Sequence, residues 1–246
     1  MRYFLEVSYK GTNYSGFQSQ KNANTIQAEV EKAFRTILKE EIQLTGSSRT
    51  DAGVHALQNY FHFDIKGELS SRLLYNLNAI LPGDIVVNKL FKVKNDAHCR
   101  FDAVSREYKY FVYQKKNPFL TDSAFYFPYT LDLESMENAA TMIKEYTDFT
   151  SFSKRNTQVK SFACDIKESE WAIEGECLVY KVKANRFLRG MVRALAATML
   201  TVGRNKVNID LFRKIIESKD CTLANFSAPA HGLFLVRVAF SDSYFN

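Results

Sequence analysis

The chain has 246 residues, with 33 lysines and arginines against 27 aspartates and glutamates, a net charge of +6 and a pI near 9.0. That length suits one large domain or two ordinary ones, and it buries enough surface to fold without disulfide or metal staples. No apolar run approaches the ~18 residues that a membrane helix needs, and Glu6 interrupts any signal-peptide core. The positive charge favours a polyanionic partner, although many basic proteins bind no nucleic acid.

The cysteines are scattered, and none forms a C-x-x-C pair or a spacing typical of a zinc ribbon or a disulfide framework. They are Cys99, Cys164, Cys177 and Cys221. We therefore expect reduced thiols in a protein of the cytoplasm.

Hydrophobic periodicity divides the first half of the chain into short elements. Residues 3–9 alternate as a strand with one better-buried face, and apolar positions from Ile26 to Leu38 have helical spacing, with Asn24 or Thr25 as the cap. The elements predicted next are a short strand at 42–44, a strand over 59–65, a helix over 70–81 and a strand over 85–87. This β-α-β-β-α-β order is the ferredoxin-like unit.

The second half repeats that order less regularly. Its predicted elements are a strand over 108–113, a helix over 133–146, strands over 162–172 and 177–184, helices over 188–202 and 210–216, and a strand over 234–240. We expect an α+β fold of two tandem ferredoxin-like halves, residues 1–103 and 104–246, with their sheets side by side around a basic cleft.

The segment Gly46–His55, GSSRTDAGVH, is the best candidate for an active site, because it places an arginine, a carboxylate and a histidine in one loop. A carboxylate can move a proton or attack carbon without a metal, so Asp51 is the predicted reactive group. The alternative is that Asp51-Ala52-Gly53 forms only a turn, since aspartate and glycine favour turns.

Several common catalytic signatures are absent. Gly11 and Gly16 have the glycine spacing of a phosphate-binding loop, but Phe17-Gln18 follow where lysine and serine or threonine are needed. The sequence has no G-x-S-x-G, H-E-x-x-H or G-x-G-x-x-G motif. The acidic and histidine residues near the loop lack the convergence of a metal site, because His62 and Asp64 share a strand face whereas Asp51 and His55 lie on a loop.

Three residues of the second half have two interpretations each. Arg189 and Arg193 are four residues apart on one face of an otherwise apolar helix, so they either reach solvent or turn toward an anion or a carboxylate. Tyr108 begins an aromatic strand, which by itself is more typical of a core than of a binding site.

Together these residues resemble the TruA family of tRNA pseudouridine synthases along nearly the whole chain. The matching blocks are residues 9–18, 49–56, 78–85, 98–101, 106–110, 148–152, 184–193 and 232–236. The string Arg49-Thr50-Asp51-Ala52-Gly53-Val54-His55-Ala56, with the later blocks in order, is highly specific and outweighs the interpretation of Asp51 as a turn residue.

The resemblance implies isomerisation of uridine to pseudouridine in the anticodon stem-loop of tRNA, at positions 38–40, by a homodimer without cofactor or metal. It implies that Asp51, Tyr108 and Arg193 are catalytic, with Arg193 pairing with the aspartate. Arg49 is expected to replace the flipped base. The other residues expected to bind substrate, together with Tyr108, are Gln18, His55, Arg100 and Arg189.

The sequence departs from the family pattern at Phe17, Ser48, Cys99 and the pair Arg189-Gly190. None of these changes removes a catalytic group, but they leave the choice of uridine open. Three alternatives also stay open: a non-catalytic RNA-binding protein, a synthase that acts on another RNA or other tRNA positions, and a small-molecule enzyme on the same scaffold.

Overall fold

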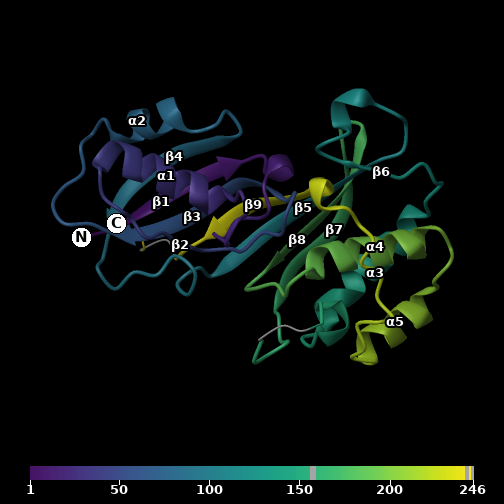
Figure 1. The fold of residues 1–246 in the computed structure, drawn as a ribbon. Coiled ribbons are helices and arrows are strands. Elements are labelled where there is room, and N and C mark those ends of the chain that lie inside the picture. The colour runs from purple at the N-terminus through teal and green to yellow at the C-terminus, as the bar shows by residue number, and fades with distance from the viewer. Residues whose placement is uncertain (156–158, 242–243, 245–246) are drawn as a thin grey trace. The chain divides into compact units, whose positions relative to one another are not determined.

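A computed structural model gives the structure of the protein and describes residues 1–155, 159–241 and 244 (Figure 1). Its contacts divide the chain into two compact units. Unit 1 comprises Met1–Val104 and Phe234–Asn246, and unit 2 comprises Ser105–Leu233. The last strand therefore joins unit 1 by its contacts, whereas the sequence-based division assigned it to residues 104–246.

Unit 1 is a sheet with two helices. Its elements are β1 (Arg2–Tyr9), η1 (Gly11–Asn13), α1 (Ile26–Leu38), β2 (Thr45–Gly46), β3 (His55–Asp64), α2 (Leu73–Ile80), β4 (Ile85–Val93) and β9 (Leu233–Ala239). The strands lie in the order β4-β1-β3-β9, with β2 also paired to β3. Strand β1 is antiparallel to β3 and β4, β2 is antiparallel to β3, and β9 is parallel to β3. The order β4-β1-β3-β2 is that of the predicted ferredoxin-like unit.

Helices α1 and α2 pack against each other and cover one face of this sheet (Figure 1). The side chain of Thr25 caps α1 by accepting a hydrogen bond from the backbone N–H of Ala28, at 3.2 Å. The helix turns Val30 and Phe34 into the core and ends where Lys39 adopts a left-handed conformation. The apolar stripe read from the sequence is thus the face that packs on the sheet.

Strand β1 is buried on both faces, which differs from the expected single buried face. Phe4, on the side expected to be the more exposed, is fully buried against the rings of Phe240 and Tyr244, at 5.5 and 5.7 Å. On the same side the carboxylate of Glu6 accepts a hydrogen bond from the hydroxyl of Tyr60 at 2.7 Å. The C-terminal segment that covers this face is distant in sequence, so local periodicity could not reveal it.

Unit 2 also combines strands with helices. Its elements are β5 (Ser105–Tyr113), η2 (Pro118–Leu120), β6 (Phe125–Tyr126), α3 (Leu133–Met142), η3 (Ile143–Glu145), η4 (Thr150–Phe152), β7 (Ile166–Glu174), β8 (Cys177–Ala184), α4 (Met191–Gly203), α5 (Ile209–Glu217) and η5 (Ala230–Gly232). The strands lie in the order β5-β8-β7, antiparallel throughout, and β6 pairs with β5 in parallel. Helix α3 packs against α4 and β7 (Figure 1).

Most predicted elements are present, and the α+β class is confirmed, but several boundaries differ. Strand β2 lies after the predicted 42–44, because side chains of α1 take up the backbone of Leu44: Glu31 accepts its N–H and Gln27 donates to its carbonyl. Helix α4 starts at Met191 rather than 188, and the short strand β6 was not predicted. Of the helices that the structure describes, none is long and apolar enough to cross a membrane.

Candidate active site

The backbone of the Asp51 loop turns sharply before β3. The N–H of Val54 donates to the carbonyl of Asp51 at 3.2 Å, and Gly53 between them has a φ of +78°. Such a turn needs a positive φ at its third residue, which glycine adopts without steric cost. The two interpretations of Asp51-Ala52-Gly53, as a turn and as part of a reactive loop, are therefore compatible.

The block after β1 packs directly on this loop. Gly11 lies so close to the loop that an added Cβ would stand 2.0 Å from the carbonyl oxygen of Val54. The N–H of Phe17 donates to the carbonyl of Thr50 at 3.1 Å. The blocks 9–18 and 49–56, about forty residues apart in sequence, therefore form one packed unit.

His55 is part of that packing. It is the first residue of β3, which corrects its expected place on the loop. The residue is 1% exposed, its Nδ1 accepts a hydrogen bond from the N–H of Gly11 at 3.0 Å, and its ring lies 4.5 Å from that of Phe234. Because Nδ1 of His55 accepts this hydrogen bond, it carries no proton.

Buried polar groups form a hydrogen-bonded network that holds the backbone of the loop. The carboxamide of Asn59 donates to the hydroxyl of Tyr9 and to the carbonyl of Ser48, each at 3.1 Å, and accepts from the hydroxyl of Ser47 at 2.7 Å. The hydroxyls of Tyr9 and Thr50 lie 2.8 Å apart. We call these five residues the Asn59 network.

The loop alternates in what it exposes. Ser48 and Thr50 are buried, Arg49 between them is exposed, and Asp51 is half-buried. The network thus holds Ser48 and Thr50 and presents the arginine and the aspartate that flank Thr50.

Two further predicted binding residues of unit 1 are exposed. Gln18 follows the segment that packs on the loop, and Arg100 lies outside the core with its guanidinium 5.9 Å from the centre of the Phe101 ring. Phe101 is itself 74% exposed. An exposed arginine above an exposed ring is suited to contacts with bases and phosphates.

Tyr108 is half-buried on β5, opposite Val182 of β8. The rings of Tyr108 and Phe187 form a T-shaped pair, with 5.2 Å between centres and an angle of 87°. The core role expected for this aromatic strand belongs to Tyr110, which is fully buried and donates its hydroxyl hydrogen to the carbonyl of Pro229 at 2.9 Å. Burial raises the pKa of the Tyr110 hydroxyl.

Arg189 and Arg193 do not share a helix face, which corrects that expectation. Helix α4 begins after Gly190, whose φ is +76°, so Arg189 lies in the turn before it. Arg193 is half-buried on the helix, and its Nε donates to the carbonyl of Ala228 at 2.7 Å. The carbonyl of exposed Arg189 accepts from the N–H of Lys154 at 3.0 Å.

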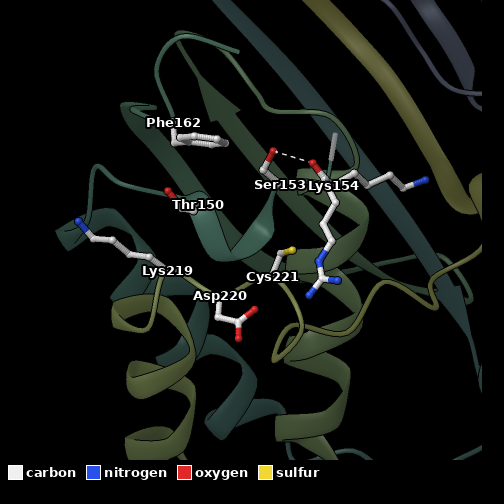
Figure 2. A pocket seen from close by; sticks show the side chains of 8 residues that line it. Thr150, Ser153, Lys154, Phe162, Lys219, Asp220 and Cys221 are labelled. Atoms are coloured by element: carbon white, nitrogen blue, oxygen red, sulfur yellow. Dashed lines mark hydrogen bonds between the residues drawn. The ribbon is translucent and has the colours of Figure 1, made fainter. Parts of the chain in front are cut away.

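A hollow in unit 2 is lined by three basic residues, Lys154, Arg155 and Lys219, and by one acidic residue, Asp220 (Figure 2). Lys219 pairs with Asp148 at 2.9 Å, and Asp220 has a pKa below its ordinary value because Thr222 hydrogen-bonds to it and Arg155 lies near. Lys154 points away from both Lys219 and Asp220 in Figure 2. Three basic residues therefore line the hollow against one aspartate, and one of the three, Lys219, is paired with Asp148.

Of the residues described, no three histidines, cysteines, aspartates or glutamates are grouped so that they could hold a metal ion. His62 lies on β3 beside Cys99, with its Nδ1 3.2 Å from the Sγ, and beside the ring of His98 at 4.5 Å. Burial, together with the charges of His98 and Arg2, lowers the pKa of His62 to about 4. It is a packed, neutral histidine at physiological pH.

Sequence reasoning missed Asn59, Tyr9 and Phe187 as neighbours of the predicted site residues. An asparagine directly before the aromatic-rich run Tyr60-Phe61-His62-Phe63 was the one signal available, since a buried amide needs partners. Those partners come from residues distant in the chain.

Comparison with known proteins gives consistent matches. A family model described as tRNA pseudouridine synthase matches residues 6–102 and 146–241. A tRNA pseudouridine synthase A of Parabacteroides distasonis is 44% identical over 246 residues, which cover 99% of this chain and 98% of the relative. Relatives of the same name from Bacteroides thetaiotaomicron and Staphylococcus aureus strain N315 are 45% and 38% identical, covering 100% and 99% of this chain and 93% and 92% of their own lengths.

Among solved structures, a partial Cas6-RT-Cas1–Cas2 complex aligns with a TM-score of 0.24 and 10% identity over 83% of this chain and 44% of that one. So low a score carries no argument. The family model and the full-length relatives do, and they agree with the residues of the Asp51 loop: the chain belongs to the tRNA pseudouridine synthase family.

Proposed function

We propose that this protein isomerises uridine to pseudouridine in the anticodon stem-loop of tRNA, with Asp51 as its essential carboxylate and no cofactor. The observation that carries the proposal is the loop itself. In a chain of this family, Asp51 follows an exposed arginine on a turn fixed by Gly53 and by the buried side chain of Thr50.

The reaction needs little beyond a positioned carboxylate. The bond from ribose C1′ to N1 breaks, the uracil turns, and C5 joins C1′ while the C5 proton leaves to solvent and N1 gains one. An ionised Asp51 either adds to C1′ or removes the 2′ proton of the ribose, and both routes are compatible with its half-buried place.

Tyr108 and Arg193 have complementary roles in this proposal. Tyr108, half-buried on β5 and in T-shaped contact with Phe187, stacks on the uracil and relays the C5 proton. Arg193 supplies a permanent positive charge that pairs with the catalytic carboxylate, because guanidinium does not lose its proton in proteins. Its hydrogen bond to Ala228 fixes the direction of the guanidinium.

The exposed residues are proposed to bind the RNA. Arg49 fills the space left when the target base leaves the stem, which offsets part of an unstacking cost of a few kcal/mol. Gln18, Arg100 and Arg189 are exposed and contact the backbone or the bases. His55 is buried, so its part in binding is to hold the loop rather than to touch RNA.

We further propose that the protein acts as a homodimer in the cytoplasm. Its cysteines are all free thiols, in keeping with a reducing compartment. The net charge of +6 is suited to a tRNA partner.

The test is release of tritium from tRNA transcripts labelled at uridine C5. We expect release by the native chain at uridines of the anticodon stem-loop. Asp51→Asn should lower the rate by about 10³-fold or more, because the amide can neither attack carbon nor accept a proton.

Asp64→Asn is the matched control, since Asp64 is an exposed carboxylate of the same unit that pairs with Arg2 at 2.7 Å. It should keep the native rate. Release that survives Asp51→Asn would contradict the role of Asp51, and tight binding of tRNA without any release would favour the non-catalytic RNA-binding protein.

A further inference from the structure

We propose that Asn59 is a positioning residue for this reaction, which sets the backbone on both sides of Arg49, next to Asp51, through the Asn59 network. The inference rests on the proposed function of the Asp51 loop. It assigns a role to a residue that cannot touch substrate, because Asn59 is 0% exposed.

The orientation of the Asn59 carboxamide follows from partners whose own roles are fixed. The carbonyl of Ser48 can only accept, so the amino group faces it, and the backbone N–H of Tyr60 can only donate, so Oδ1 faces that, at 2.9 Å. The remaining amino hydrogen goes to Tyr9, and the remaining lone pair of Oδ1 accepts from Ser47. Two donors and two lone pairs are thus all satisfied.

A fully satisfied buried amide has one stable orientation. Turning it over would place its amino group against a donor and its oxygen against a carbonyl, at a residue that is fully buried. The carboxamide therefore acts as a rigid template for the chain that passes over it.

That chain contains the predicted catalytic residues. Asn59 binds the carbonyl of Ser48, which belongs to the peptide bond that leads into Arg49. Through the hydroxyl of Tyr9 it also reaches Thr50, the residue between Arg49 and Asp51. Two anchors on either side of Arg49 leave the loop little freedom to move the carboxylate of Asp51.

Such a device should affect the chemical step more than binding. Reacting groups must be held close to the productive geometry, and a displacement of about 1 Å can cost about a hundredfold in rate. Affinity for tRNA is spread over many contacts and is less sensitive to the place of one carboxylate.

The test uses Tyr9→Phe, because removing Asn59 itself leaves several buried groups unpaired and could prevent folding. The variant removes one hydroxyl and keeps the ring. With folded protein at a temperature well below its Tm, we expect kcat for tritium release to fall about tenfold to a hundredfold, and KM for tRNA to change by less than about threefold.

Tyr60→Phe is the matched control. Tyr60 is also buried and bonded through its hydroxyl, to Glu6, but it follows Asn59 on β3 and so points to the other sheet face. It should lower Tm as Tyr9→Phe does while kcat stays native. Thr50→Val breaks the same bond as Tyr9→Phe, so the double variant should lose no more than the worse single variant.

Each outcome is decisive. Native kcat in folded Tyr9→Phe, or equal losses in Tyr9→Phe and Tyr60→Phe, would overturn the positioning role while native activity and its loss in Asp51→Asn leave the proposed function standing. A native chain that releases no tritium would instead overturn the proposed function, and with it this role.

Discussion

Ser47 and Ser48, two adjacent serines of the Asp51 loop, differ in the hydrogen bonds that their hydroxyls make. The Ser47 hydroxyl donates to Asn59 at 2.7 Å, whereas the buried Ser48 hydroxyl reaches no hydrogen-bond partner among the described residues. A buried polar group without a partner costs about 1–3 kcal/mol. We therefore expect Ser48→Ala to raise the free energy of unfolding by about 1 kcal/mol, measured by denaturant titration.

Ser47→Ala is its matched control, with the same atoms removed one residue earlier. It should lower the free energy of unfolding by about 1–3 kcal/mol, because Asn59 loses a partner. A loss of stability in Ser48→Ala would show that its hydroxyl is satisfied in solution, and the contrast between the two serines would fail.

Asp51 and Asn59 differ in how much the sequence says about them. Asp51 was predicted because its neighbours in the chain form a specific string. The role of Asn59 was not predicted, because it depends on hydrogen bonds to Tyr9 and Ser47. The pairing of β1 with β3 and the loop before β3 bring these two residues to Asn59. Strand alternation shows that an asparagine lies on a buried face, but not which atoms it meets.

At the scale of elements, the start of α4 depends on one backbone conformation. Gly190 has a φ of +76° and a Cβ there would stand 3.1 Å from Cγ of Lys154. A left-handed residue with a side chain costs about 1–2 kcal/mol. Gly190→Ala should lower the free energy of unfolding by that amount plus the displacement of the lysine.

Gly175, in the turn between β7 and β8, separates the two contributions. Its φ is +58° and no atom lies within 4 Å of an added Cβ, so Gly175→Ala has the backbone cost alone. Lys154→Ala combined with Gly190→Ala should reduce the loss to that of Gly175→Ala. Equal losses for the two glycines in the native background would mean that Lys154 moves aside without cost.

The predicted boundaries of elements were wrong where residues distant in the chain determine the boundary. Periodicity predicted α1 and β8 well, because the local sequence of α1 is amphipathic and that of β8 is rich in strand-forming residues. Strand β3 begins at His55 instead of 59, because His55 and Ala56 pair with β9, which is far along the chain. The strand predicted at 42–44 is absent because α1 side chains bind that backbone.

At the scale of the whole molecule, charge should control the encounter with tRNA. The chain carries six more positive than negative side chains. Each phosphate neutralised by a lysine or arginine releases counterions, so the affinity falls with salt at a slope of roughly −0.7 to −0.9 per contact. Even two such contacts weaken binding by about tenfold when salt rises fourfold.

We therefore expect Kd for tRNA to rise at least about tenfold between 50 and 200 mM salt, measured by filter binding or anisotropy. Asp51→Asn should show the same slope, since that residue acts on the sugar and not on phosphates. A Kd insensitive to salt would mean that stacking and base contacts hold the RNA, and the excess charge would then serve solubility rather than recognition.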